Sequence, residues 1–127
     1  MSLNVLVVDD SAVMRAMILK SLRIAKVPVG EVYEASNGQE GLEGLQQHWI
    51  DLAIVDINMP VMDGEQMVEL AQADPETADT PIIVVSTEGS ETRINRLINR
   101  GVRFVHKPFA PEVIRDVIFE MIGVRDD

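Results

Sequence analysis

The residues best suited to chemistry are three carboxylates, two hydroxyls and one lysine, each near the end of a short apolar run. In chain order they are Asp9, Asp10, Asp56, Ser86, Thr87 and Lys107. If the ends of these runs meet, the carboxylates come within a few ångströms of one another. Two like charges about 4 Å apart repel by roughly 4 kcal/mol at a protein-surface dielectric. Such a cluster therefore needs a cation or bound protons.

This combination of charges predicts a magnesium site that supports phosphoryl transfer. Mg²⁺ prefers hard oxygen ligands and keeps several waters, so it needs few protein ligands. Lys107 offsets part of the acidic charge, and a divalent cation neutralises the rest. Asp56 can then attack a phosphoryl group and form an aspartyl phosphate. The Ser86 hydroxyl can hydrogen-bond one phosphoryl oxygen, while the metal and Lys107 offset the charge of the others.

Each fragment alone also has an ordinary structural explanation. Acidic residues such as Asp9 and Asp10 favour the positive end of a following helix. Asp63-Gly64 is typical of a turn, and Lys107-Pro108 of a strand end. The predicted chemistry therefore depends on the elements that bring the fragments together.

Five apolar runs rich in β-branched residues predict strands over residues 3–8, 31–35, 52–57, 81–86 and 102–106. Several are nearly continuous in Val, Ile and Leu, as is typical of parallel strands covered on both faces. Segments of helical period lie between and after the strands. Their apolar positions are Met14, Ile18, Leu22 and Ala25; Leu42, Leu45 and Trp49; Met67, Leu70 and Ala71; Ile94, Leu97 and Ile98; and Ile114, Val117, Ile118 and Met121.

Helix start and stop signals agree with this alternation. Ser11 is suited to cap the first helix, Pro111 to open the last one, and Gly101 to end the fourth. Five strand–helix units predict an α/β fold, a doubly wound parallel sheet with helices on both faces. Ligands bind such sheets at the carboxyl ends of the strands, where the candidate residues stand.

Composition excludes several classes of protein. The 127 residues predict one domain over 1–127, with 46% hydrophobic and 25% charged residues typical of a globular chain. The sequence has no cysteine, no run long enough to span a bilayer and no signal-peptide pattern, which predicts a cytoplasmic protein without membrane insertion. A net charge of −10 argues against direct nucleic-acid binding.

The charge is unevenly spread along the chain. Residues 27–92 contain 14 of the 21 acidic residues and no Lys or Arg. Arg93, Arg96 and Arg100 follow at helical spacing, with Arg103 nearby. This stripe is either a solvated helix face or a basic surface for an acidic partner or a second copy of the chain.

Taken in order on five strands, these fragments resemble the receiver domain of two-component response regulators over essentially the whole chain. The matching pieces are Asp9-Asp10, Asp56, Met59-Pro60, Asp63-Gly64, Ser86 and Lys107-Pro108-Phe109. The resemblance implies a flavodoxin-like sheet with strand order 2-1-3-4-5. It is strongest to single-domain chemotaxis-type regulators, through the run from Asp10 to Arg15. No effector domain is expected, because the sequence stops soon after the last predicted helix.

The resemblance also implies roles for individual residues. Asp56 would take phosphate from the phosphohistidine of a sensor histidine kinase or a phosphotransfer protein. Asp10, Asp56 and the Asn58 carbonyl would ligate Mg²⁺, with Asp9 acting through water. Ser86 and the aromatic Phe104 would respond to phosphorylation, and the peptide bond before Pro108 would be cis. The changed surface of the fourth helix, fifth strand and fifth helix would then regulate a downstream target protein, as a monomer or a phosphorylation-dependent dimer.

Thr87 departs from the family, in which the residue after the switch hydroxyl is often small. Strand alternation and the spacing to Lys107 favour Ser86 as the switch hydroxyl over Thr87. The β-branched Thr87 is expected to hinder water at the phosphoryl group and to slow self-dephosphorylation. Beyond that slow step and its own phosphorylation, the chain is not expected to be an enzyme.

Alternative functions are also open at this point. A phosphorelay intermediate and a receiver fragment of a larger regulator fit the same residues. A phosphohydrolase resembling the haloacid dehalogenases also forms an aspartyl phosphate, but needs an acid where this chain has Asn58. A flavodoxin-like electron carrier needs a phosphate-binding loop rich in Ser, Thr and Gly after the first strand, and residues 11–14 do not form one.

Overall fold

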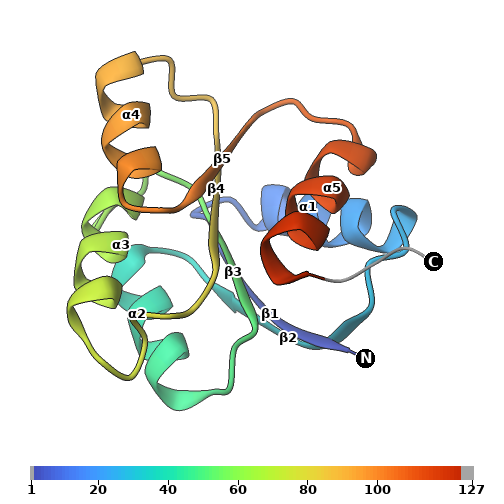
Figure 1. Cartoon of the computed structure of the whole chain (residues 1–127), viewed down its shortest axis with the longest axis horizontal. Coiled ribbons are helices and arrows are strands. Elements are labelled where there is room, and N and C mark those ends of the chain that lie inside the picture. The colour runs from blue at the N-terminus through green and yellow to red at the C-terminus, as the bar shows by residue number, and fades with distance from the viewer. Residues whose placement is uncertain (1, 124–127) are drawn as a thin grey trace.

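The computed structural model describes residues 2–123, in which five strands alternate with five helices (Figure 1). The strands are β1 (Leu3–Val8), β2 (Val29–Ala35), β3 (Leu52–Val55), β4 (Ile82–Ser86) and β5 (Arg103–His106). The helices are α1 (Ala12–Ile24), α2 (Gly38–Gln47), α3 (Gly64–Ala73), α4 (Glu91–Asn99) and α5 (Pro111–Ile122). This alternation confirms the predicted α/β pattern. The chain end beyond residue 123 lies outside the described residues.

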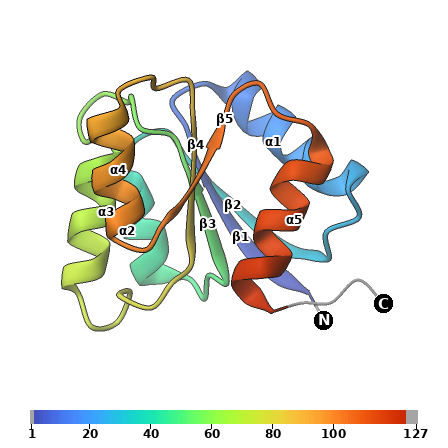
Figure 2. The ribbon, with the colours of Figure 1, turned by 45° about the horizontal axis from the view of Figure 1, so that its top comes forward.

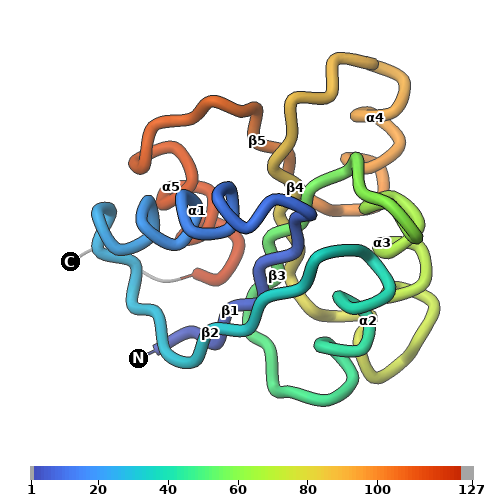
Figure 3. The backbone as a smooth tube through the Cα atoms, turned by 180° about the vertical axis from the view of Figure 1, so that it is seen from behind, coloured from blue at the N-terminus to red at the C-terminus, as the bar shows by residue number. Residues whose placement is uncertain are grey.

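The strands form one parallel sheet in the order β2-β1-β3-β4-β5, which confirms the predicted flavodoxin-like topology. Helices α1 and α5 cover one face of the sheet, and α2, α3 and α4 cover the other (Figure 2). The view from behind shows the same two groups (Figure 3). The strand order reverses at β1, whose two neighbours are β2 and β3. The residues that follow β1 and β3 therefore stand at the switch point, where such folds bind ligands.

The sheet separates two hydrophobic layers. Every residue of β3 and β4 is buried, because helices cover both faces and successive strand side chains point to opposite sides. The layer under α1 and α5 includes Val5, Val7, Ile54, Ile83, Ile114 and Ile118. The layer under the other helices includes Leu6, Val8, Val55, Val84, Met67 and Leu97. These layers fix the strand register, and with it the positions of the strand ends.

The predicted helix boundaries are confirmed at three places. The Ser11 side chain accepts a hydrogen bond from the Met14 N–H and caps α1. Pro111 is the first residue of α5. Gly101 follows α4 with φ of 88°, a left-handed conformation that glycine adopts without a steric penalty. Each described helix is too short or too polar to span a bilayer.

The prediction that Trp49 lies on the apolar face of the second helix was wrong. This residue lies after the end of α2 with 80% of its surface exposed, and does not pack on the sheet. The reason lies one residue earlier, where His48 leaves the helical conformation and stacks on Tyr33 with ring centroids 3.9 Å apart. Leu70 and Ile98 are also half-exposed at the edges of their helix faces.

The end of β3 differs from prediction in a way that matters for the site. β3 ends at Val55, two residues earlier than predicted, so Asp56 is the first residue beyond the strand. Its N–H still donates to the Val8 carbonyl at 2.9 Å, which fixes Asp56 beside the end of β1. The second strand begins at Val29, two residues earlier than predicted.

Candidate functional site

Four loops meet at the carboxyl edge of the sheet, after β1, β3, β4 and β5 (Figure 2). Asp9, Asp10 and Asp56 each place a carboxylate oxygen within 4.8 Å of the other two, and we call these residues the acidic cluster. The predicted convergence of the three carboxylates is confirmed. At this separation their mutual repulsion is substantial unless a cation or a proton offsets it.

Asp9 is the buried member of the acidic cluster, with 1% of its surface exposed. One carboxylate oxygen accepts the Ser11 N–H at 2.9 Å, and the other accepts the Lys107 ammonium at 3.0 Å. The Arg15 side chain donates to the Asp9 carbonyl at 2.6 Å, which fixes the backbone as well. Asp9 is therefore fixed by hydrogen bonds from three residues, Ser11, Arg15 and Lys107. Asp10, in contrast, is exposed.

Asp56 is partly buried, and this burial affects the pKa of its carboxyl group. Burial is the largest influence and raises its pKa, because a charged carboxylate loses hydration. The Lys107 ammonium lowers the pKa, the Asp9 carboxylate raises it, and hydrogen bonds from Ser86 and the Ile57 N–H lower it. Burial and the Asp9 charge prevail, so the pKa of Asp56 lies above its ordinary value.

We expect Asp56→Asn to raise the melting temperature in EDTA at pH 7 by roughly 3–6 °C. Because the pKa of Asp56 is raised on folding, the folded state binds its proton more tightly than the unfolded chain. The stability from this proton is present below the unfolded pKa and is lost as pH rises through the folded pKa. The neutral Asn has no such loss. The difference in melting temperature between the variant and the unmodified protein should therefore shrink toward pH ~4, where Asp56 is protonated in the folded state.

Thermal unfolding from pH 4 to pH 8, followed by circular dichroism, measures this effect. Glu43→Gln is the control, since it also removes one charge but from an exposed position on α2. A gain that is the same at every pH, or equal in the control, would contradict the assignment to Asp56.

Lys107 is the positive group of the site. Its ammonium nitrogen lies 3.0 Å from Asp9 Oδ2 and 3.6 Å from Asp56 Oδ2, and 11% of the side chain is exposed. The bond between Lys107 and Pro108 is cis, as the resemblance implied. The lysine thus bridges the two less exposed carboxylates of the acidic cluster, while Asp10 has no ion-pair partner within residues 2–123.

The two neighbouring hydroxyls have different surroundings. Ser86 ends β4 fully buried, and its hydroxyl oxygen accepts the Glu88 N–H at 3.2 Å. Thr87 follows the strand and is exposed. The burial of Ser86, and the hydrogen bond from the Lys107 N–H to its carbonyl at 3.0 Å, favour Ser86 over Thr87 as the hydroxyl that faces the acidic cluster.

Phe104 occupies an intermediate position on β5. It packs at the border of the hydrophobic layer that contains Leu97, and its ring meets His106 edge-on with centroids 4.6 Å apart. It is neither fully buried nor fully exposed. This position differs from that of a core aromatic residue, and it leaves the ring next to α4.

The arginine stripe, for which the sequence left open a solvated helix face or a basic partner surface, is ion-paired within the molecule. Arg93 pairs with Asp63 and Glu88, both at 2.9 Å, and with Glu65 at 3.3 Å. Arg96 also pairs with Glu65, at 2.7 Å, and hydrogen bonding from Arg96 is the main reason that the pKa of Glu65 is lowered.

The other two arginines are paired as well. Arg100 lies 3.5 Å from Glu69, and Arg103 lies 2.9 Å from Glu120. The acidic middle segment thus supplies the partners of Arg93, Arg96 and Arg100, whereas the partner of Arg103 comes from α5.

Arg93 also connects the stripe to the site, which the sequence did not indicate. Its guanidinium donates to the Asn58 side chain at 3.1 Å, in addition to its pairs with Asp63 and Glu88. Asp63 is more than a turn residue, since it caps α3 in a reciprocal capping box with Gln66. No local spacing in the sequence links Arg93 to Asn58 or Asp63, so only the tertiary structure reveals these two contacts.

Comparisons with known proteins agree with this geometry. The family model described as response regulator receiver domain matches residues 5–119. A chemotaxis protein CheY homolog of Campylobacter jejuni is 33% identical over 123 residues, which cover 95% of this chain and 93% of the relative.

Solved structures give the same result. Chemotaxis response regulator CheY4 of Vibrio cholerae has a TM-score of 0.81 and 32% identity, over 95% of this chain and 99% of that chain. The receiver domain of sensor histidine kinase PA1611 from Pseudomonas aeruginosa has a TM-score of 0.83 over 98% of this chain and 100% of that chain. Its structure holds a magnesium ion in the active site cleft, but its 20% identity shows only that the fold is shared.

Proposed function

Because this chain belongs to the response regulator receiver domain family, we propose that it is a signalling switch whose phosphoryl acceptor is Asp56. The observation that carries the proposal is the acidic cluster with Lys107 beside it. The Lys107 ammonium lies 3.0 Å from Asp9 and 3.6 Å from Asp56, so a negative group added to Asp56 has a cation within reach. Histidine kinases or phosphotransfer proteins are the proposed donors.

The residues present fit a magnesium ion. The three carboxylates of the acidic cluster lie within 4.8 Å of one another, and carboxylate oxygens are the ligands that Mg²⁺ prefers. We assign Asp10, Asp56 and the Asn58 carbonyl as direct ligands, with Asp9 acting through water because Lys107 and Ser11 already occupy its oxygens. When bound, the ion supplies charge neutralisation to phosphoryl oxygens.

In the proposed transfer, a carboxylate oxygen of Asp56 forms a bond to phosphorus while the phosphorus–nitrogen bond of a phosphohistidine breaks. The electron pair of that bond stays on the imidazole nitrogen of the donor. The Ile57 N–H donates to Asp56 Oδ1 at 2.8 Å and orients the carboxylate, and Oδ2 faces Lys107. Lys107 and the Ser86 hydroxyl then stabilise the new phosphoryl oxygens.

Phosphorylation adds nearly one negative charge and several strong acceptors at Asp56. In the proposed response, Ser86 moves toward the phosphoryl group. The loop after β4, helix α4 and Phe104 on β5 then change position. The structure supports this route, since Ser86 holds the Glu88 N–H and Glu88 pairs with Arg93 of α4. The changed surface of α4, β5 and α5 would then be read by a downstream target, or by a second copy of the chain.

The exposed Thr87 is proposed to slow loss of the phosphoryl group by hindering water. We expect Thr87→Ala to speed the decay of the aspartyl phosphate about two- to tenfold, which is roughly 0.4–1.4 kcal/mol in the barrier. The measurement is the decay of labelled protein after removal of the donor, with Thr92→Ala as a control on α4. An unchanged decay rate would remove Thr87 from the mechanism.

The matched relatives are CheY-type signalling proteins, which disfavours a phosphohydrolase. The same similarity supports a role in chemotaxis. A phosphorelay intermediate, or a receiver within a larger regulator, would use the same residues. The single-domain organisation over 1–127 and the cytoplasmic location stay predictions.

Labelling with acetyl phosphate tests the proposal without a partner kinase. We expect the protein to gain one phosphoryl group in the presence of Mg²⁺, and labelling to fall at least tenfold in EDTA. Intact mass measures the modification, and the loss of the label in alkali identifies an acyl phosphate. Labelling that is equally fast in EDTA would contradict the role of the acidic cluster.

A further inference from the structure

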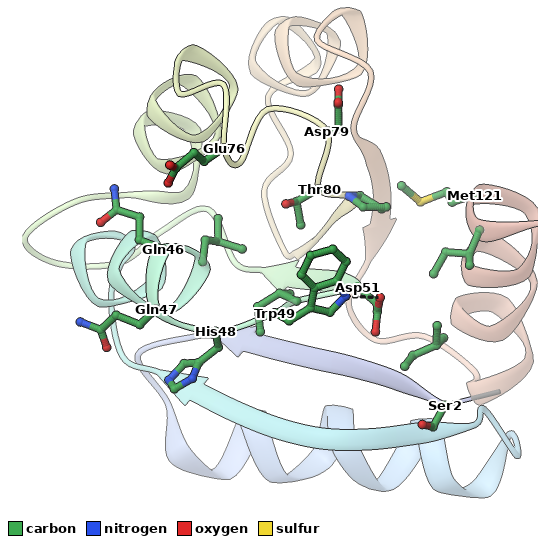
Figure 4. Close-up of a pocket in the computed structure, with 15 residues that line it drawn as sticks. Ser2, Gln46, Gln47, His48, Trp49, Asp51, Glu76, Asp79, Thr80 and Met121 are labelled. Atoms are coloured by element: carbon green, nitrogen blue, oxygen red, sulfur yellow. Dashed lines mark hydrogen bonds between the residues drawn. The ribbon is translucent and has the colours of Figure 1, made fainter.

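A groove of about 790 Å³ lies at the amino edge of the sheet (Figure 4). The acidic cluster follows the strand ends at the opposite edge. The lining of the groove comes from the start of β1, the end of α2 and the segment between α2 and β3, the segment between α3 and β4, and the end of α5. In a parallel sheet, the strand starts are separated from Asp56 by the length of the strands. The groove is therefore distinct from the site proposed above.

Trp49 is the most unusual residue of the groove. It is the only tryptophan in the sequence, and 80% of its surface is exposed. Its indole N–H donates to Asp51 at 3.3 Å, and its carbonyl accepts from the Asn4 amide at 3.1 Å. A large aromatic ring is thus held at the surface in a defined setting, where burial against a partner would gain free energy.

The charge of the groove is entirely acidic. Asp51, Glu76 and Asp79 line it, and no Lys or Arg does. Within residues 2–123, the carboxylates of Glu76 and Asp79 have no ion pair and no hydrogen bond, in contrast to the paired acids beside α4. The nearby Met121 and Ile122 add apolar surface at the end of α5. Among residues 2–123, the groove thus combines an aromatic face, apolar surface and carboxylates without an ion-pair partner.

We propose that this groove binds a short basic segment of a partner protein. A Lys or Arg side chain would stack on the Trp49 indole, since cations bind favourably over aromatic faces. Further basic side chains of the segment would face Glu76 and Asp79, and their aliphatic stems would contact the apolar surface. Because the groove and Asp56 lie at opposite edges of the sheet, this binding does not require phosphorylation. The receiver domain would thus carry an anchoring surface in addition to its switch surface.

Tryptophan emission gives a direct test, because Trp49 is the only indole in the protein. The probe is the blocked peptide Arg-Leu-Arg-Leu-Arg, which contains no aromatic residue. We expect a saturable change in emission that weakens as salt concentration rises, because exposed charges are screened. The peptide Glu-Leu-Glu-Leu-Glu should cause no change. A linear, unsaturated response to the basic peptide would overturn the proposal.

Paired charge variants separate the groove from general attraction to an acidic protein. Glu76→Gln combined with Asp79→Asn should weaken basic-peptide binding about three- to tenfold. Glu43→Gln combined with Glu112→Gln removes the same charge from exposed positions outside the groove and should leave affinity unchanged. Asp56→Asn should also bind normally. Equal weakening by both double variants would overturn the proposal, and so would a loss of binding in Asp56→Asn. The phosphoryl-acceptor role of Asp56 would be unaffected by either result.

Discussion

Asp56→Asn is expected to lower Mg²⁺-dependent labelling by acetyl phosphate at least ~10³-fold, because it removes the nucleophile itself. The amide has nearly the shape of the carboxylate, so the Ile57 N–H can still donate to its oxygen. The variant should therefore fold normally, with the increased stability expected from the loss of a partly buried charge. Intact mass after incubation with acetyl phosphate measures the outcome.

The matched control is Asp116→Asn, which makes the same chemical change on α5, where 69% of the side chain is exposed. This control should be labelled as fast as the unmodified protein. Normal labelling of the Asp56 variant would show that another residue accepts the phosphoryl group. Since Asp9 and Asp10 are adjacent, peptide mapping of the label would identify the true acceptor.

Gly64→Ala is expected to destabilise the fold by about 3 kcal/mol and to lower the melting temperature by roughly 10 °C. An added Cβ would lie 2.1 Å from the Asp56 carbonyl oxygen and 2.9 Å from the Ile57 Cα. Both neighbours are backbone atoms, which cannot move aside as a flexible side chain can. The Gly64 N–H also donates to the Ile57 carbonyl at 2.8 Å, so α3 starts in direct contact with the loop that carries Asp56.

Gly89→Ala is the control for this prediction, because an added Cβ there meets nothing within 4 Å. Circular dichroism melts of both variants measure the difference. Because Gly64→Ala displaces the Asp56 peptide, phosphoryl acceptance should also fall at temperatures where the variant is still folded. A melting temperature equal to that of Gly89→Ala would mean that the loop after β3 adapts freely.

The strands and the residues at their ends were predictable because the signals are local, whereas the strand order was implied by the resemblance to receiver domains. Continuous runs of Val, Ile and Leu mark covered parallel strands, and the polar residue after each run marks its end. Asp9, Asp56 and Lys107 therefore met as expected, although 47 and 51 residues separate them along the sequence. Parallel topology alone brings the carboxyl ends of such strands to one edge.

Contacts between distant side chains were not predictable in the same way. The helical spacing of Arg93, Arg96 and Arg100 was visible, but the acids that neutralise them come from α3 and the loop after β4. The helical spacing also predicted that Trp49 shares an apolar helix face. That spacing contains no information that α2 ends at Gln47. In both cases the deciding partner lies on another element, which a periodicity argument does not include.

The contacts of Arg93 have a consequence for how the switch changes state. One guanidinium joins Asn58 after β3, Asp63 and Glu65 at the start of α3, and Glu88 after β4. A displacement of Arg93 would thus release Asn58, the start of α3 and Glu88 together. We expect an all-or-none rearrangement with few half-changed molecules, so that a population under partial stimulation contains two discrete forms in varying proportion.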